Sequence, residues 1–591
     1  MKRSSENSND SSKIQVTEDG KAKSLFNSKL WDPEFRDQMK DTITNNKPYE
    51  WGTITDLVDD ELLRAVRKEI ETEISFSTKE TDIYRLNQSG DLANLSNLDD
   101  ENLKRLPNLY KLRSILYSNE FRKFMAYITQ SGKLSESKRD LNIAIYNKNC
   151  HLLPHDDVVG SRRISYILYL PEPDRKWKDH YGGGLRLYDS KKENVPYNDP
   201  FAKLVPQFNQ IAFFKIQPGL SFHDVEEVVV DKNRLSLQGW FHIPQEGEDG
   251  YIENEEKEWI QNYITKLTEE DASDELKQYE FPKDDRSLIS SSLIKEFEKS
   301  FKDFEFTKLT DNDIKLLKDF ISEEYLTNEK IAEIQEEFIA NSTINLSSFL
   351  NDEKSELLKN LIKHEELQNE CPNLTKDVKN PWKVASPIHK WKFMYIDGKP
   401  ELKDDNQEDN EGSNFKLLRE TIDQERLKLE NELIKVVEFL KSKTFKKFIL
   451  LLTKMIPITE QILIRRFRSG NDFTMANRIE LNKYLENIEG YIASILEATL
   501  CLTPSTNWED GTNGGYEVFM AEVDDNAVNI DIKDTTVYDN KHDSVLINNN
   551  ASWNTFSLAL IDDSLLEFVK YVSFNAKGSR WDIKMKWDVK E

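Results

Sequence analysis

The chain has 591 residues, three cysteines and a formal net charge of −26 at pH 7. Its length exceeds what one hydrophobic core usually holds, and its acidic surface repels polyanions, so we expect several folded parts and no direct nucleic-acid binding. The cysteines are scattered and lack CxxC spacing, and no apolar run resembles a membrane span or a signal region, so we expect reduced thiols in an intracellular compartment and no membrane partner.

The N-terminal part combines a polar tail with helical patterns. Residues 1–22 are polar and rich in Ser, Asn and Lys, which predicts a disordered tail. Asp59 or Asp60 can cap a helix whose apolar residues recur every three or four positions from Leu63 to Ile74. A second helical stretch is expected from about Leu109 to Ile128.

Short β-like runs separated by Pro and Gly turns begin near residue 141. Several short strands with such turns are typical of an all-β barrel or jelly roll. A run of three glycines, 182–184, is followed by neither a helix pattern nor a Lys-Ser/Thr pair, so we interpret it as a hairpin turn and not as a nucleotide site. The expected strands lie at 164–170, 210–216, 228–230 and 235–237.

The second half repeats the layout of the first. Helical patterns return near 293–361 and 415–452, with an acidic, solvated insertion near 397–414 between them. The β-rich region that follows has the same order of Pro, Trp, Asp and Gly-Gly as the first one, which predicts two copies of one β unit. In this alignment Leu566 takes the place of His223, and 467–477 matches the first copy's His-Xaa-Asp region without a histidine. The second copy should therefore be unable to hold a metal ion in the same way.

Two histidines, a carboxylate and a trailing arginine form the most informative pattern. His155 and Asp157 are two residues apart, so their side chains share one face of an extended segment. His223 follows a Pro-Gly turn, and Arg234 starts another β-like run. Two imidazoles and one carboxylate can bind one face of Fe(II) and leave the other face open for 2-oxoglutarate and O₂. A guanidinium can hold the far carboxylate of that co-substrate.

Several nearby residues have two interpretations. Tyr146 and Tyr169 could donate to a co-substrate carboxylate, or they could be core aromatics. Asp156 should point away from its neighbours, and Trp240 is interpreted as core packing. Zinc is an alternative metal, although zinc sites rarely add an arginine that binds a carboxylate. The other histidines of this region are interpreted as structural: His151, His180 and His242.

At these residues the chain resembles the fungal and animal family of ribosomal prolyl hydroxylases. The resemblance covers nearly the whole chain except the tail and the acidic insertion, and it includes the second β copy. The stretches that carry it are 84–92, 151–165, 177–187, 205–210 and 221–228.

The resemblance implies a mainly β, α+β protein with two double-stranded β-helix (jelly-roll) domains, each flanked by helices. The catalytic domain would span 23–275 and the non-catalytic domain 276–591. The resemblance also implies Fe(II), 2-oxoglutarate and O₂, with ascorbate as an optional addition. The iron ligands would be His155, Asp157 and His223. The co-substrate residues would be Arg234, Tyr169 and Tyr146.

The implied reaction is 3,4-dihydroxylation of a prolyl residue in a small-subunit ribosomal protein. The family connection also implies roles in translation termination accuracy and mRNA poly(A) metabolism, in the nucleus and the cytoplasm. Termination factors and poly(A)-binding protein are the expected partners. Two alternatives stay open, an oxygenase that acts on lysyl residues or nucleic acid, and a scaffold in a termination complex whose metal site senses oxygen.

Overall fold

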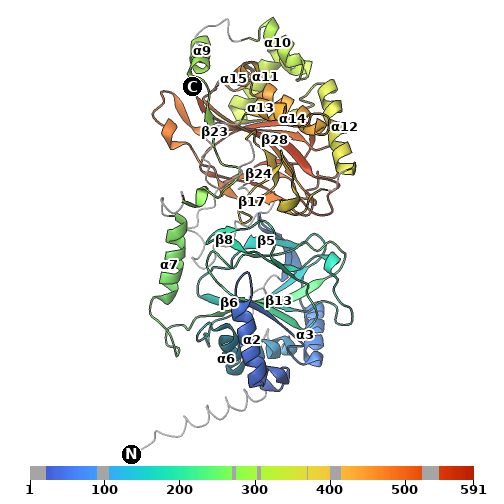
Figure 1. The fold of residues 1–591 in the computed structure, drawn as a ribbon, viewed down its shortest axis with the longest axis vertical. Helices are drawn as coiled ribbons and strands as arrows, with labels where there is room; N and C mark the ends of the chain where they lie inside the picture. The colour runs from blue at the N-terminus through green and yellow to red at the C-terminus, as the bar shows by residue number, and fades with distance from the viewer. Residues whose placement is uncertain are drawn as a thin grey trace, which may run out of the picture. The chain divides into compact units, whose positions relative to one another are not determined.

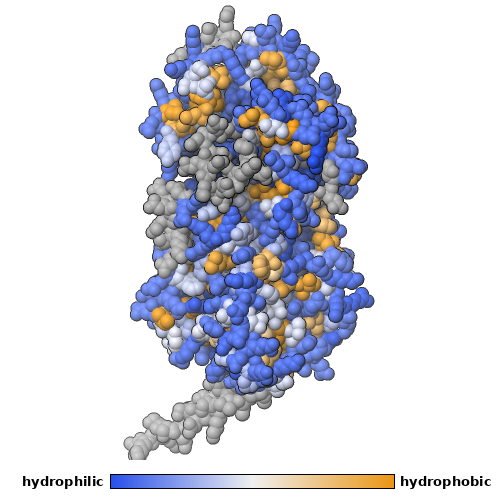
Figure 2. All heavy atoms as spheres, in the orientation of Figure 1, coloured by the Kyte–Doolittle hydropathy of each residue, from blue (hydrophilic) through white to orange (hydrophobic). Residues whose placement is uncertain are grey.

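A computed structural model describes residues 22–89, 105–268, 275–301, 308–368, 371–399, 414–521 and 545–591. These residues divide into two compact units, the first ending at Gln278 and the second starting at Tyr279 (Figure 1). The expected tail and the acidic insertion lie almost entirely outside the described residues. In the part of the chain that the structure describes, no helix is long and apolar enough to cross a membrane. Hydrophilic residues dominate the visible surface (Figure 2).

The helices of the first unit follow the predicted caps and spacing. Asp59 caps α3 by accepting a hydrogen bond from Leu62 N. The stretch expected as one helix near 109–128 forms two, because the chain leaves the helical conformation at Tyr117 and Ser118 caps the next helix. The helices are η1 (Ser28–Trp31), α2 (Pro33–Asn45), α3 (Asp60–Glu73), α5 (Pro107–Leu116), α6 (Asn119–Thr129), η3 (Asp179–Tyr181) and α7 (Glu255–Thr268).

Eleven antiparallel strands form one curled sheet in the first unit, in the order β1-β11-β6-β13-β4-β3-β5-β12-β7-β10 with β2 paired to β3. The expected strand at 228–230 is wrong, because Val228 N and Val229 N bond to Cys150 O and Tyr181 O without forming a ladder. The strands are β1 (Trp51–Thr55), β2 (Phe76–Glu80), β3 (Tyr84–Ser89), β4 (Arg139–Tyr146), β5 (His151–His155), β6 (Arg162–Tyr169), β7 (Leu185–Leu187), β10 (Ala202–Leu204), β11 (Gln210–Lys215), β12 (His223–Val225) and β13 (Arg234–His242). A separate pair joins β8 (Ser190–Lys192) and β9 (Val195–Pro196).

The two faces of this sheet have different roles. Leu235, Leu237 and Phe241 of β13 pack with the helices in the main core of the unit. Because side chains alternate along a strand, the other face of β13 carries the intervening residues, and the helices leave this face free for a site. These residues are Arg234, Ser236, Gln238 and Trp240.

The second unit also combines helices with antiparallel sheets. Its helices are α9 (Ser291–Phe301), α10 (Asp311–Lys318), η5 (Glu323–Leu326), α11 (Asn328–Asn341), α12 (Asp352–Gln368), η6 (Thr375–Asp377), α13 (Phe415–Thr421), α14 (Lys428–Leu440), α15 (Lys443–Thr453) and η7 (Lys483–Leu485). Its strands are β14 (Ser287–Leu288), β15 (Thr343–Ser347), β16 (Lys383–Val384), β17 (Trp391–Lys392), β18 (Met394–Ile396), β19 (Ile456–Pro457), β20 (Thr459–Phe467), β21 (Phe473–Thr474), β22 (Asn477–Arg478), β23 (Tyr491–Leu502), β24 (Glu517–Ala521), β25 (Val545–Asn549), β26 (Trp553–Ile561), β27 (Leu565–Val569) and β28 (Arg580–Lys590).

The strand order of the second unit repeats that of the first. The run β15-β26-β23-β28-β20 corresponds to β1-β11-β6-β13-β4, and the run β22-β27-β24-β25 corresponds to β5-β12-β7-β10. In each run the strands occur in the same relative order along the chain, and all pairs are antiparallel. The two units therefore share one arrangement of paired strands.

The register corrects one part of the sequence alignment. A Cβ on Gly182 would lie 1.8 Å from Glu227 O, and one on Gly514 would lie 1.8 Å from Tyr571 O, so these glycines are equivalent. The strands β7 and β24 each start three residues after the equivalent glycine. His223 pairs with the third residue of β7, Leu187, and Glu567 pairs with the third residue of β24, Phe519. The equivalent of His223 is therefore Glu567 and not Leu566. A slip of one residue matters because it moves a side chain to the opposite face.

Candidate metal centre and co-substrate pocket

Two imidazoles and one carboxylate converge inside the first unit. His155 ends β5, His223 starts β12, and the two residues pair directly across the ladder. In the loop after β5, Asp157 places Oδ1 3.5 Å from His155 Nε2 and Oδ2 3.6 Å from His223 Nε2. Ligand atoms of the three residues all lie within 4.8 Å of one another, a spacing that one metal ion can bridge.

Backbone carbonyls orient both imidazole rings. His155 Nδ1 lies 2.9 Å from Leu153 O, and His223 Nδ1 lies 2.9 Å from Ser221 O. A carbonyl can only accept, so each Nδ1 carries a proton, and the Nε2 atom of a neutral ring can act as a metal ligand beside Asp157. The donor set therefore fits a divalent metal ion.

The pKa shifts of the three groups follow from their burial and mutual contact. Burial lowers the pKa of His223 to about 4, and the neighbouring His155 adds to the shift. Burial would raise the pKa of Asp157, but the hydrogen bond and charges of the histidines bring it well below its usual range. Burial lowers the pKa of His155, but Asp157 outweighs burial and the net shift is upward. At neutral pH Asp157 is thus ionised and His223 neutral, while a proton on His155 competes with a metal ion.

Asp156 supports the loop that carries Asp157. Its carboxylate accepts hydrogen bonds from Val158 N at 3.3 Å and from Gly219 N at 3.2 Å. Its backbone carbonyl accepts a bond from Ser221 Oγ at 2.9 Å. These bonds join the loop after β5 to the turn before His223. Asp156 therefore has a structural role and lies outside the metal trio, which comprises His155, Asp157 and His223.

Arg234 is a buried side chain with unused hydrogen-bond donors. It is 0% exposed, and its guanidinium carbon lies 4.8 Å from the ring centre of Tyr146 and 4.9 Å from that of Tyr169. In the described part of the chain, Nε and Nη2 of Arg234 and the hydroxyl of Tyr169 have no hydrogen-bond partner. A buried guanidinium without a counter-ion is costly, so these side chains fit an anionic ligand such as a carboxylate.

The other residues of the β13 inner face make polar contacts that the sequence pattern did not predict. Arg234 Nη1 donates to Ser236 Oγ at 3.4 Å, and Gln238 Nε2 donates to the Tyr146 hydroxyl at 3.4 Å. Trp240 packs on the inner apolar cluster as expected, but its Nε1 also donates to Asp157 Oδ2 at 3.2 Å. Alternation of side chains from Arg234 onward was the signal that could have found all three residues.

The three histidines interpreted as structural lie outside the trio. His151 Nδ1 is 3.1 Å from Asn149 O, and the ring of His180 lies against that of Tyr181. His242 contacts Ser161 Oγ at 3.0 Å and Asp140 Oδ2 at 3.1 Å.

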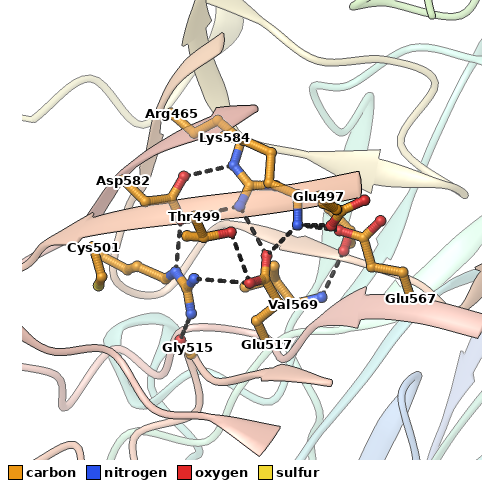
Figure 3. A network of polar contacts seen from close by, with 12 residues as sticks. Arg465, Glu497, Thr499, Cys501, Gly515, Glu517, Glu567, Val569, Asp582 and Lys584 are labelled. Carbon is orange, nitrogen blue, oxygen red and sulfur yellow. Dashed lines mark hydrogen bonds and ion pairs between the residues drawn. The ribbon is translucent and has the colours of Figure 1, made fainter. Parts of the chain in front are cut away.

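The second unit has charged side chains at the equivalent positions (Figure 3). Arg580 corresponds to Arg234, because it pairs with Phe467 as Arg234 pairs with Tyr146. Arg580 already has hydrogen-bond acceptors within the chain, since its Nε donates to Asp582 Oδ2 at 2.9 Å and its Nη1 donates to Gly515 O. Donors that have no partner on Arg234 are therefore bound within the chain on Arg580.

The amine of Lys584 lies among three carboxylates of the second unit. Its ammonium contacts Glu497, lies 2.9 Å from Glu517 Oε1 and lies 2.9 Å from Oε1 of Glu567, the residue equivalent to His223. Lys586 Nζ is 3.1 Å from Glu567 Oε2. The network balances four carboxylates against four cations: Glu497, Glu517, Glu567 and Asp582 against Arg465, Arg580, Lys584 and Lys586.

Sequence comparison finds similarity to known families in both units. Residues 141–242 match the 2OG-Fe(II) oxygenase superfamily, and residues 312–591 match the family described as oxoglutarate and iron-dependent oxygenase degradation C-term. The prolyl 3,4-dihydroxylase OGFOD1 of Ostreococcus tauri is 29% identical over 562 residues, which cover 93% of this chain and 97% of that protein. The prolyl 3-hydroxylase OGFOD1 of Xenopus laevis is 33% identical over 216 residues, which cover 36% of this chain and 38% of that protein.

Solved structures of oxygenases also match part of the chain. A Pseudomonas putida prolyl-4-hydroxylase is 19% identical with a TM-score of 0.23, and the match covers 34% of this chain and 98% of that one. A prolyl hydroxylase from Trichoplax adhaerens, solved with a hypoxia inducible factor peptide fragment, is 16% identical with a TM-score of 0.26, and the match covers 36% of this chain and 92% of that one.

Proposed function

We propose that this chain, an Fe(II)- and 2-oxoglutarate-dependent prolyl hydroxylase that resembles the prolyl 3,4-dihydroxylases over nearly its whole length, dihydroxylates a prolyl residue of a small-subunit ribosomal protein. The observation that carries the assignment of the site is the convergence of His155, Asp157 and His223 in a sheet that also buries an unpaired Arg234. Each of these groups has the charge and the free donor or acceptor atoms that the reaction requires.

The metal would bind through Nε2 of both histidines and a carboxylate oxygen of Asp157. Bound iron with 2-oxoglutarate and O₂ supplies the oxidising power that converts a C–H bond to C–OH while the co-substrate becomes succinate and CO₂. The backbone carbonyls of Leu153 and Ser221 keep both rings oriented for this role.

Arg234 would pair with the distal carboxylate of 2-oxoglutarate, and the Tyr169 hydroxyl would donate to the same group. Both side chains are buried and have hydrogen-bond donors without partners, so the carboxylate would supply the acceptors that these donors lack. Tyr146 would mainly support the guanidinium with its ring, because its hydroxyl already accepts from Gln238. The apolar inner cluster around Leu187 and Phe214 would keep water away from the reaction.

The second unit would be a double-stranded β-helix without catalytic activity. The repeated strand order supports the shared fold, and the closed ion network supports the absence of a metal and co-substrate site. Its role would be to stabilise the protein or to bind partners, such as termination factors or poly(A)-binding protein. The scaffold role can therefore coexist with catalysis, one in each unit.

The acidic charge of the chain supports a basic protein substrate. A net charge of −26 attracts the basic surface of a ribosomal protein and disfavours direct contact with RNA. Through this substrate the chain would affect termination accuracy and poly(A) metabolism, and it would act in the nucleus and the cytoplasm.

His155→Ala tests the proposed function. We expect the variant to lose succinate formation from 2-oxoglutarate in the presence of a prolyl peptide, because one imidazole ligand is gone. His180→Ala, outside the trio, is the matched control and should keep full turnover. Unchanged turnover in His155→Ala would reject the metal assignment.

Mass spectrometry of the substrate separates the alternatives. Gain of one or two oxygen atoms on a prolyl residue supports the proposal, whereas loss of a methyl group supports an oxygenase of lysyl residues or nucleic acid. Full cellular activity of the inactive His155→Ala variant would instead favour the scaffold role.

A further inference from the structure

Asp157 differs from the other two groups of the metal trio in how the chain holds it. His155 and His223 belong to paired strands, whereas Asp157 follows β5 in a loop and has a φ of 61°. Few residues other than glycine adopt this left-handed conformation, although aspartate tolerates it. A carboxylate on a loop can also rotate and present either oxygen, so its orientation needs a further contact.

Trp240 makes that contact. Its indole Nε1 donates to Asp157 Oδ2 at 3.2 Å, and the described contacts place no such donor on Oδ1, which faces His155 Nε2 at 3.5 Å. An indole N–H can donate but cannot accept, so the bond identifies Oδ2 as the acceptor oxygen and leaves Oδ1 for a metal ion.

The position of Trp240 makes the contact rigid. The residue lies on β13, where it pairs with Asp140 of β4 and with Ser165 of β6. Arg234 is six residues away on the same strand, so the two side chains share the inner face at a separation of about 20 Å. One central strand thus carries both the co-substrate arginine and the tryptophan that contacts Asp157.

Arg162 restrains the indole from its other side. Its guanidinium carbon lies 3.7 Å from the centre of the Trp240 ring, which is a close cation–π contact. Arg162 starts β6, the strand that pairs with β13, so both members of the stack belong to the sheet. The ring is therefore held in the plane that directs its N–H to Asp157.

The second unit provides an internal comparison. Six residues after Arg580, at the position of Trp240, stands Lys586, which lies 3.1 Å from Glu567. The unit that lacks the two histidines thus also lacks the indole and its stacked arginine at these strands. The tryptophan accompanies the metal trio and is not required by the shared strand arrangement.

We propose that Trp240, held by Arg162, is a positioning residue that orients the Asp157 carboxylate for monodentate metal binding. This inference rests on the proposed function only in requiring a divalent metal ion at the trio. It would survive if the substrate proved not to be a prolyl residue.

Trp240→Phe removes the indole N–H and keeps an aromatic ring. We expect Mn²⁺ affinity of the protein without co-substrate to fall about 10- to 100-fold, the usual effect of losing a partner of a metal ligand. Titration followed by electron paramagnetic resonance measures this affinity without any turnover. Trp31→Phe is the matched control, because its indole donates to Lys23 O elsewhere in the same unit, and it should bind Mn²⁺ as the unmodified protein does.

A thermal unfolding curve without metal separates positioning from general stability. A positioning role predicts the loss of affinity in a Trp240→Phe protein whose metal-free unfolding temperature matches that of Trp31→Phe. A folded Trp240→Phe protein with unchanged Mn²⁺ affinity overturns the inference. If Trp240→Phe does not fold, the Arg162→Gln variant takes its place, because it removes the cation–π contact and keeps the indole. A several-fold weaker Mn²⁺ affinity of Arg162→Gln supports the proposal, and an unchanged Mn²⁺ affinity rejects it.

Discussion

Two equivalent buried arginines, Arg234 and Arg580, differ in whether they have a counter-ion. Arg234 and Arg580 occupy equivalent positions on equivalent strands and both are buried. Arg580 has Asp582 two residues later as its counter-ion, whereas Arg234 has Ser236 there and keeps free donors. The presence of serine and not aspartate at this position leaves Arg234 without the counter-ion that Arg580 has.

Arg234→Lys should raise the 2-oxoglutarate concentration needed for half-maximal turnover by about 10- to 100-fold, because an ammonium cannot make the bidentate contact of a guanidinium. Steady-state succinate formation against co-substrate concentration measures this shift. The control is Arg64→Lys, a change at an exposed ion pair with Asp174, which should leave the half-maximal 2-oxoglutarate concentration unaltered. Mn²⁺ affinity without co-substrate should also stay unchanged, and an equal loss there would show that Arg234 acts on the metal trio instead.

At the level of elements, β13 and β28 show how one strand arrangement can hold opposite interiors. The outer faces of both strands are apolar and pack under helices. The inner face of β13 carries an arginine without a counter-ion, whereas that of β28 carries charged residues that pair with one another and with charged residues of neighbouring strands (Figure 3). Lys584 in particular supplies a positive charge among three carboxylates, as a bound cation would.

Lys584→Ala should turn this interior into a cation site. Removing the ammonium leaves Glu497, Glu517 and Glu567 close together without their shared counter-ion, which should cost about 3–5 kcal/mol of folding stability. Made in a His155→Ala background, the variant should bind Mn²⁺ in the second unit, and added Mn²⁺ should raise its unfolding temperature. Lys586→Ala in the same background keeps Lys584 and should gain no such binding; equal behaviour of the two variants would contradict the assigned role of Lys584.

The whole chain carries a large acidic charge, with a formal net charge of −26 at pH 7. Its visible surface is mostly hydrophilic (Figure 2). Charge of this size acts over distances set by the salt concentration, with a screening length of about 8 Å at physiological ionic strength. It therefore influences how fast and how tightly a basic substrate associates, and it has little effect on the short-range contacts within the metal trio.

The KM for a basic prolyl peptide should rise several-fold between about 0.05 and about 0.5 M salt, because screening weakens its attraction to an acidic enzyme. The control is the same peptide with Ser in place of its basic residues. Its KM should change little over this range of salt. A salt-independent KM for the basic peptide would show that local contacts, and not the net charge, bind the substrate.

Much of the site could be predicted because its chemistry is local in the chain. His155 and Asp157 stand two residues apart, and Arg234 opens a clear β-like run, so residue type and spacing were sufficient to select them. The cap of α3 at Asp59 was predictable for the same reason. The strand at 228–230 was wrong because β propensity alone does not provide a pairing partner.

The sequence by itself therefore determined the residue types of the metal centre, the alternation of strands and the presence of two related β regions, since periodicity and composition are properties of the chain. Only the tertiary structure decided that Trp240 reaches Asp157, that Arg234 is unpaired and that Glu567 is the equivalent of His223. These facts depend on strand register and on contacts between residues far apart in the chain, and a shift of one residue in register exchanges the two faces of a strand.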